Sequence, residues 1–210
     1  MILDQIFKDL SELKAGKGVW QNEFHQYDVY THMVKCAEHI KEFTSDRDLI
    51  AAAYLHDIGK PVAAKPKYKD GVIQRHPSGA QYHKYKNHES IGEQMVREMD
   101  SDFFKKLDLN QDRVAHLVGY HYMPMTHIKV MRKMSTYEGF LKHYQQLDKL
   151  LDEAPVEKED IMILFLADTL AKGGHIENKA ELLTIRKALL GQEKNLRKVY
   201  EIQRAYVIAA

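Results

Sequence analysis

The sequence contains very little cysteine and no long apolar segment. Cys36 is the only cysteine among 210 residues, so no disulfide can form within the chain, as is typical of proteins of the reducing cytosol. The first ten residues, MILDQIFKDL, are too acidic and too short in apolar length for a secretory signal. The longest strongly apolar run, residues 161–167, is too short to span a bilayer. These absences predict a soluble, cytoplasmic protein with no membrane partner.

The sequence also lacks an excess of charge of either sign. Its 31 basic and 30 acidic side chains give a net charge of +1, which excludes a global nucleic-acid-binding signature. Positive charge is nevertheless concentrated in residues 60–86. This segment holds six lysines, including Lys60, and one arginine, and Asp70 is its only acidic residue. With 44% hydrophobic residues, the composition suits one globular domain with a sizeable core.

Apolar residues recur at helical spacing along most of the chain. The spacing predicts helices that include residues 29–43, 48–57, 91–99, 114–121, 161–168 and 178–206. Ser45 and Asp48 form a capping-box pattern at the start of the second helix, and Gly59 and Pro61 are expected to close it. Asn110 is a candidate cap for the fourth helix.

One segment, residues 62–86, departs from this period. It holds Pro66, Asp70-Gly71, Pro77 and Gly79 around two short β-like runs, which predicts a loop or a small hairpin. No internal repeat or low-complexity linker occurs, so the sequence predicts a single all-α domain over residues 1–210. The charged helix at 178–206 could pack on this bundle or form a homodimer contact, and packing is the favoured interpretation.

The helical phase decides which of the twelve histidines point inward. His32 borders the apolar stripe of its helix, whereas His88 and His121 each continue the apolar line of theirs. Asp168 extends an apolar line inside IMILFLADTLA, where an unpaired carboxylate would cost several kcal/mol or take up a proton. A positive group is therefore expected to meet Asp168.

The sequence YLHDIGKP places a histidine and an aspartate together where a helix finishes its buried face. Adjacent His56 and Asp57 would point about 100° apart on a helix, so one could bind a metal terminally while the other reaches between two metals. Each polar residue taken alone is more often a hydrogen-bonded core residue or a solvated helix end. As a set they form a candidate site for two divalent ions: His32, His56, Asp57, His88, His121 and Asp168.

The chemistry of these side chains restricts the metal. Imidazole and carboxylate ligands suit Fe, Mn, Zn, Co or Ni, and no thiol takes part, which argues against a structural zinc site. His25 and His39 share the seven-residue spacing of His32, but a helix would hold them about 10 Å apart, too far for one ion. The prediction therefore keeps only His32 of the three.

The motif order resembles that of the HD-domain metal phosphohydrolase superfamily. The stretches that carry the resemblance, over residues 28–172, are YTHM, LHDIGK, NHESIG, GYHYMP and LFLADTLAK. HDIGKP, the basic turn and NHE are especially similar to the HD domains attached to bacterial tRNA nucleotidyltransferases, although the nucleotidyltransferase part is absent here. The resemblance implies an HD-type helical bundle that binds divalent ions, with Mg added to the metals above.

The resemblance also implies a function. We expect hydrolysis of a phosphoester by a metal-activated hydroxide. The substrate would be a nucleotide, another small phosphate ester or an RNA end, and the enzyme would be a phosphomonoesterase or a 2′,3′-cyclic phosphodiesterase. Asp57 would bridge the ions and Lys60 would bind a phosphate oxygen, with His83, Lys84 and Tyr85 as further substrate contacts. The alternatives are an HD-type diiron oxygenase, which would use the same ligands, and a non-catalytic nucleotide-binding module. Lys60 and the basic segment favour a phosphate substrate.

Overall fold

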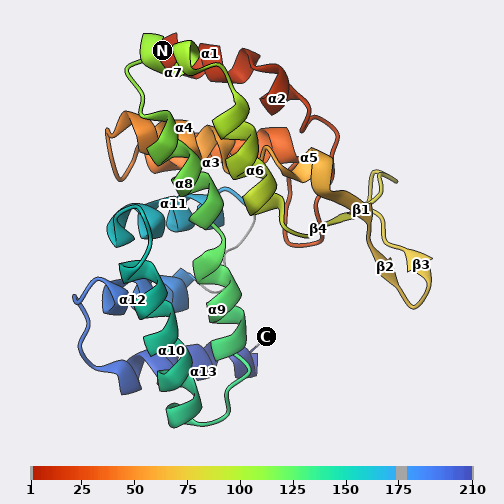
Figure 1. Cartoon of the computed structure of the whole chain (residues 1–210). Coiled ribbons are helices and arrows are strands. Elements are labelled where there is room, and N and C mark those ends of the chain that lie inside the picture. The colour runs from red at the N-terminus through yellow and green to blue at the C-terminus, as the bar shows by residue number, and fades with distance from the viewer. Residues whose placement is uncertain (1, 174–178, 210) are drawn as a thin grey trace.

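The protein is mainly helical, and its computed structural model describes residues 2–173 and 179–209. The strands form two small antiparallel sheets, so the predicted all-α fold with a short hairpin insertion is confirmed (Figure 1). In chain order the elements are α1 (Ile2–Asp9), α2 (Ser11–Lys14), α3 (Val29–Ile40), α4 (Arg47–Leu55), α5 (Lys60–Ala63), β1 (Ala64–Pro66), β2 (Tyr68–Lys69), β3 (Val72–Ile73), β4 (His83–Tyr85), α6 (His88–Glu98), α7 (Ser101–Lys106), α8 (Gln111–Tyr120), α9 (Met123–Met131), α10 (Tyr137–Asp152), α11 (Lys158–Leu170), α12 (Lys179–Leu189) and α13 (Leu196–Ala209).

The described helices bury two separate hydrophobic cores. In the first, α3 packs on α4 and α11, and α6 packs on α8. In the second, α9, α10, α12 and α13 gather at the other end of the molecule (Figure 1). Helix α11 belongs to both, because Leu164 and Ala167 lie in the first core while Met162 and Phe165 lie in the second. Apolar residues on both sides of α11 therefore hold the two cores together.

The predicted helix at 178–206 is wrong, since the chain forms two helices in that region. Residue 178 lies outside the described residues, α12 ends at Leu189, and α13 begins only at Leu196. Gly191 has φ +70°, a left-handed conformation that favours glycine and commonly ends a helix. The backbone N–H of Gln192 donates to the Lys187 carbonyl across this turn. The chain thus doubles back, and α12 packs against α13 and α11.

The helix that carries the HDIGK motif starts and ends differently from the prediction. Asp46, one residue after Ser45, is its N-cap and accepts hydrogen bonds from the backbone N–H groups of the next turn. The helix ends at Leu55, and residues 56–59 form a tight turn. Pro61 lies in the first turn of the short helix α5 instead of closing α4, as suits a residue with a fixed φ and no N–H. The Asn110 cap is confirmed, with the Arg113 N–H as donor.

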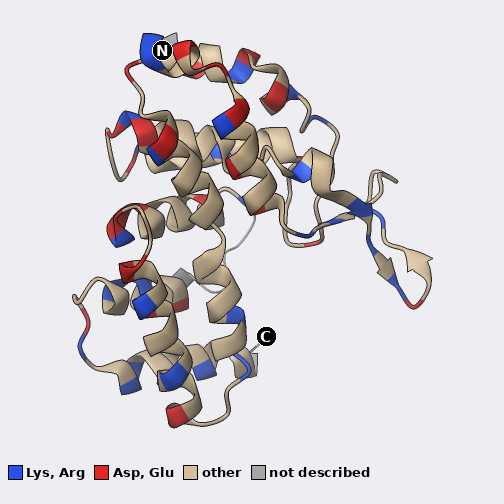
Figure 2. Ribbon diagram, in the orientation of Figure 1, with Lys and Arg blue, Asp and Glu red and all other residues tan. Residues whose placement is uncertain are grey.

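Residues 64–85 form the insertion that the sequence predicted. Strand β1 pairs with β4, with Lys65 opposite Lys84, and β2 pairs with β3. The insertion projects from the helical body and carries basic residues along its length (Figure 2). Among the described residues, none of the helices has both the length and the apolar character needed to cross a membrane.

Candidate metal centre

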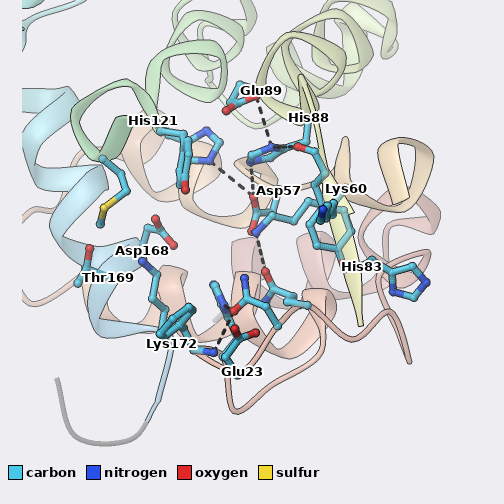
Figure 3. A pocket seen from close by; sticks show the side chains of 18 of the residues that line it. Glu23, Asp57, Lys60, His83, His88, Glu89, His121, Asp168, Thr169 and Lys172 are labelled. Atoms are coloured by element: carbon cyan, nitrogen blue, oxygen red, sulfur yellow. Dashed lines mark hydrogen bonds and ion pairs between the residues drawn. The ribbon is translucent and has the colours of Figure 1, made fainter. Parts of the chain in front are cut away.

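The six predicted ligand side chains meet in the interior of the protein. Figure 3 shows four of them, Asp57, His88, His121 and Asp168. His32 lies on α3, His88 is the first residue of α6, and Asp168 lies on α11. His56 and His121 are the residues that directly follow α4 and α8, and Asp57 lies in the turn after α4. All six are buried, with exposed fractions of 0% for His32 and His56, 1% for Asp57 and His121, and 4% for His88 and Asp168.

The four imidazoles share one orientation. In each, Nδ1 is hydrogen-bonded to a backbone carbonyl oxygen: Ala171 for His32 at 3.2 Å, Ala53 for His56 at 2.9 Å, Tyr85 for His88 at 2.9 Å and Val118 for His121 at 2.7 Å. A carbonyl oxygen can only accept, so Nδ1 carries the proton in every case. In its neutral form each imidazole then turns an Nε2 lone pair toward the cluster, as in histidines that bind metals.

Asp57 stands between two groups of donor atoms. Its Oδ2 lies 3.4 Å from His32 Nε2 and 3.2 Å from His56 Nε2. Its Oδ1 lies 3.3 Å from His88 Nε2 and 3.6 Å from His121 Nε2. In each triad that shares Asp57, the donor atoms lie within 4.8 Å of one another. One carboxylate thus faces two sets of imidazoles with its two oxygens, an arrangement that could hold a metal ion on either side.

Asp168 completes the first of these groups. Its Oδ1 lies 2.9 Å from His32 Nε2 and 3.7 Å from His56 Nε2. The sequence predicted a positive group beside Asp168, and the two candidates are His56, whose pKa is raised, and the Lys172 ammonium. Burial opposes the charge of Asp168, yet the more distant Lys172 ammonium and His32 hold the pKa of Asp168 well below its usual value.

Electrostatics within the cluster favour a bound cation. The Nε2 atoms of His32 and His56 are only 3.2 Å apart, and two lone pairs would repel at this distance, so a proton or a metal ion must lie between them. Burial lowers the pKa of His32. Burial also lowers that of His56, but the adjacent Asp57 carboxylate outweighs it and raises the His56 pKa well above its ordinary value. Metal binding would then displace a proton from His56.

Two buried atoms of the cluster test its fit to metal ions. Asp57 Oδ1 and His88 Nε2 make no hydrogen bond to any described residue, although buried polar atoms nearly always have a partner. A divalent cation bound between them would satisfy both atoms. Together with the nitrogen and oxygen donor set, this shows that the buried His/Asp cluster could bind metal ions.

Lys60 lies next to the bridging carboxylate. Its ammonium donates to Asp57 Oδ2 at 2.5 Å and to the Gln21 side-chain oxygen at 2.6 Å, and it lies 5.5 Å from the centre of the Tyr85 ring. Burial opposes ionisation of Asp57, but His56 and Lys60 hold its pKa well below the usual value. Asp57 is therefore an anion at neutral pH and Lys60 its nearest lysine.

A close backbone contact sets the position of this turn. A Cβ atom built on Gly59 would lie 2.2 Å from the His88 carbonyl oxygen and 2.7 Å from the Gly92 backbone nitrogen. Only glycine leaves room for the turn to approach α6 this closely. Because Gly59 lies between Asp57 and Lys60 and touches His88, the contact brings the two halves of the cluster together.

The cluster opens into a cavity of about 950 Å³. The predicted substrate contacts His83, Lys84 and Tyr85 all line it from β4. His83 Nδ1 and the Tyr85 hydroxyl also donate to the carbonyl oxygen of Trp20, so these two side chains join the insertion to the segment before α3. In Figure 3, His83 lies at some distance from Asp57, which places it at the rim of the cavity.

The structure adds cavity residues that sequence reasoning missed. The seven-residue spacing excluded His25 on the premise that it shares a helix with His32, and this premise is wrong because His25 precedes α3. The centre of the His25 ring lies 5.1 Å from that of His32, and His25 also lines the cavity. Lys129, Thr169 and Lys172 line the opposite wall. Thr169 and Lys172 could have been noticed, since they lie one and four residues after Asp168. Nothing in the sequence distinguishes Lys129 from a solvated helical lysine.

Comparison with known proteins agrees with this geometry. The family model described as "HD domain" matches residues 25–173, which include all six clustered side chains. The A-adding tRNA nucleotidyltransferase of Deinococcus radiodurans is 41% identical over 54 residues, which are 25% of this chain and 12% of that protein. No solved structure gives a significant match. The family match spans well over half of the chain, and we conclude that the protein belongs to the HD-domain family.

Proposed function

We propose that the protein is a metal-dependent phosphohydrolase that cleaves a phosphoester of a nucleotide or of a nucleic-acid end. The observation that carries this proposal is the shared orientation of four buried imidazoles, whose Nδ1 atoms are all held by backbone carbonyls and whose Nε2 atoms converge on Asp57. The HD-domain family is generally one of metal-dependent hydrolases, so membership supports the same reaction class.

The donors divide into two sites in this proposal. His32, His56 and Asp168 would hold one divalent ion with Asp57 Oδ2, and His88 and His121 would hold a second with Asp57 Oδ1. Two such ions, when bound, supply Lewis-acid polarisation of a phosphoryl oxygen and an acidified water molecule. The candidate metals are those that the sequence predicted, Fe, Mn, Co, Ni, Zn or Mg.

Lys60 has a separate role in this proposal. Its ammonium is held between Asp57 and Gln21 at the inner end of the cavity, where it can donate to a non-bridging oxygen of the scissile phosphoryl group. Charge that develops on that oxygen in the transition state would strengthen the contact. Tyr85 shields one side of Lys60, and His83 and Lys84 would contact the remainder of the substrate at the rim.

The nature of the substrate is inferred from the charges around the cavity. Lys84 on the insertion and Lys86 directly after it line the cavity, as does Lys67, which pairs with Glu23. Lys84 and Lys86 suit an anionic substrate. The matched relative is named for an activity on tRNA, and this adds support for a nucleotide or an RNA end.

A metal analysis combined with a substrate screen tests the proposal. Protein purified without chelator should contain divalent metal, and the Asp57→Ala variant should lose it, whereas His116→Ala, which alters a histidine outside the cluster, should keep it. Nucleoside monophosphates, 2′,3′-cyclic nucleotides and 3′-phosphorylated oligonucleotides are then assayed with Mn, Co, Ni, Mg and Fe. Phosphate release or ring opening by the wild type, with or without oxygen, is the expected result.

Two outcomes would contradict the proposal. Metal-loaded protein that is inert toward every phosphoester would remove the hydrolase assignment, and oxygen uptake coupled to bond cleavage in the iron-loaded protein would replace it with an oxygenase. The Lys60→Met variant separates catalysis from folding. It should lower kcat/KM by roughly 10²–10³-fold, a far larger effect than its effect on the melting temperature.

A further inference from the structure

The cavity wall on the α11 side carries positive charge that the metal centre does not use. Thr169 lies on α11 next to Asp168, Lys172 follows three residues later, and Lys129 faces the cavity from α9. Figure 3 shows Thr169 and Lys172 on the Asp168 side of the cavity, away from Lys60 and His83. This wall therefore lies across the metal centre from the residue that we assign to the scissile phosphoryl group.

Lys172 has no counter-charge in contact. It lies partly buried at the cavity, and its ammonium forms no ion pair or hydrogen bond with any described residue. The nearest carboxylate that acts on it is Asp168, which is already in contact with His32. Because Lys172 lines the cavity without a described carboxylate in contact, its ammonium is available to an anion that enters the cavity.

Thr169 provides an independent indication of a ligand at the same place. Its side chain is 4% exposed and its hydroxyl has no hydrogen-bond partner within the described chain. A threonine on a helix usually satisfies its hydroxyl with the carbonyl four residues earlier, as Thr184 does with Ala180 at 2.7 Å. Thr169 therefore lines the cavity and carries a buried hydroxyl whose donor and lone pairs are unused within the described chain.

Lys129 adds a second cation to this wall. Its ammonium donates to the Tyr122 hydroxyl and lies 5.1 Å from the centre of that ring, with no carboxylate in contact within the described residues. By contrast, the neighbouring Arg132 is neutralised by two hydrogen bonds to Glu181, at 2.9 Å and 2.6 Å. Among the described residues, two lysines without a carboxylate in contact and a threonine with an unpartnered hydroxyl thus line the same cavity. Ammonium and hydroxyl groups are the donors of an anion site.

We infer that Thr169, Lys172 and Lys129 form a second anion subsite, which binds a phosphoryl group of the substrate other than the one at the metal centre. The inference rests on the proposed function for the identity of the substrate. It narrows the substrate class to phosphoesters with a second phosphoryl group, supplied either as a monoester on the same nucleotide or as the adjacent phosphodiester of a strand end.

Equilibrium binding to the metal-loaded protein tests the subsite without relying on turnover. The probes are adenosine 3′-monophosphate, adenosine 3′,5′-bisphosphate and a 3′-phosphorylated diadenosine, measured by calorimetry at 4 °C and checked for integrity by chromatography afterwards. The wild type should bind at least one of the two probes with two phosphoryl groups about tenfold or more tighter than the monophosphate. Preference for the bisphosphate indicates a monoester partner, and preference for the diadenosine indicates a strand end.

Variants then assign the preference to this wall. Lys172→Met and Thr169→Val should remove most of the preference and leave monophosphate binding unchanged, and Lys172→Arg should restore it. Lys149→Met, which removes an exposed lysine of α10 that does not line the cavity, should not affect it. Melting temperatures confirm that each variant folds. Equal loss of affinity for all three probes in Lys172→Met would show that Lys172 acts on the first phosphoryl group, and it would overturn the inference, as would a wild type without preference.

The two proposals fail separately in these experiments. Tight binding of a probe with two phosphoryl groups that is not hydrolysed with any of the metals would contradict the phosphohydrolase function and leave the subsite in place. Hydrolysis of all probes with equal affinity would contradict the subsite and leave the phosphohydrolase function in place.

Discussion

The contact between Gly59 and α6 gives the most specific prediction about the metal centre. Gly59 has φ −72°, which alanine adopts without strain, so the Gly59→Ala variant tests space alone. The new Cβ would lie 2.2 Å from the His88 carbonyl oxygen, whereas ordinary contacts begin at 3.4 Å, so the turn and α6 would have to separate by about 1.2 Å. Both neighbouring atoms belong to the backbone of α6 and cannot turn aside as a side chain can.

The magnitude follows from this geometry. Overpacking of a well-packed core costs about 1–3 kcal/mol, occasionally more, and a rigid backbone neighbour places Gly59→Ala at the upper end. For a chain of this size, about 3 kcal/mol lowers the melting temperature by roughly 6–12 °C. Since His88 moves with α6 and Asp57 with the turn, metal affinity should also fall, by about 10–100-fold.

Gly92→Ala is the matched control for this variant. It adds a methyl group on the other side of the same contact, but its closest neighbour is a side-chain carbon of Val118 at 3.0 Å, and the Gly59 nitrogen lies 3.5 Å away. Thermal unfolding and metal titration are measured for both variants. A Gly59→Ala protein that melts and binds metal like the wild type, or no worse than Gly92→Ala, would refute the reasoning.

Three further predictions concern stability. Burial opposes the charge of Asp46, but its hydrogen bonds with Arg113 hold its pKa below the usual value, so Arg113→Met should destabilise the protein at pH 7. The difference in melting temperature between the wild type and this variant should disappear as the pH falls below about 4. A difference that does not change with pH would contradict this. Arg132→Met should cost about 3–5 kcal/mol because it leaves the buried Glu181 unpaired, and adding Glu181→Met should recover most of the loss in chemical denaturation. Asn110→Ala removes a helix cap and should cost about 1 kcal/mol, measured in the same way.

The sequence predicted the positions of the cluster side chains better than the course of the helices that carry them. The apolar lines through His88, His121 and Asp168 marked their burial, because helical phase is a local property of the chain. The ends of α4 and the turn at Gly191 were not predicted, since a helix boundary depends on caps and tertiary contacts several residues away. That the clustered side chains bind metal stays a proposal.

The second wall of the cavity lay beyond sequence reasoning for a physical reason. Lys129 and Lys172 are separated by more than forty residues and by α10, and a lysine in a sequence gives no sign of whether it is solvated. The pairing of Arg132 with Glu181 across a similar separation was equally hidden. What makes these residues informative is the absence or presence of a partner in space, which only packing of the helices decides.

Helix α11 belongs to both hydrophobic cores, and the cavity is lined by residues from the helices of both. We call the helices around the first core the first body and those around the second core the second body. Most of the clustered side chains come from segments of the first body, whereas Lys129 comes from the second. A ligand that touches both would clamp them together, so amide hydrogens in α9 and α10 should exchange more slowly once it binds. Conversely, loosening of the second body would remove one wall and leave the histidines in place, giving a chain that still binds metal but no longer distinguishes one anion from another.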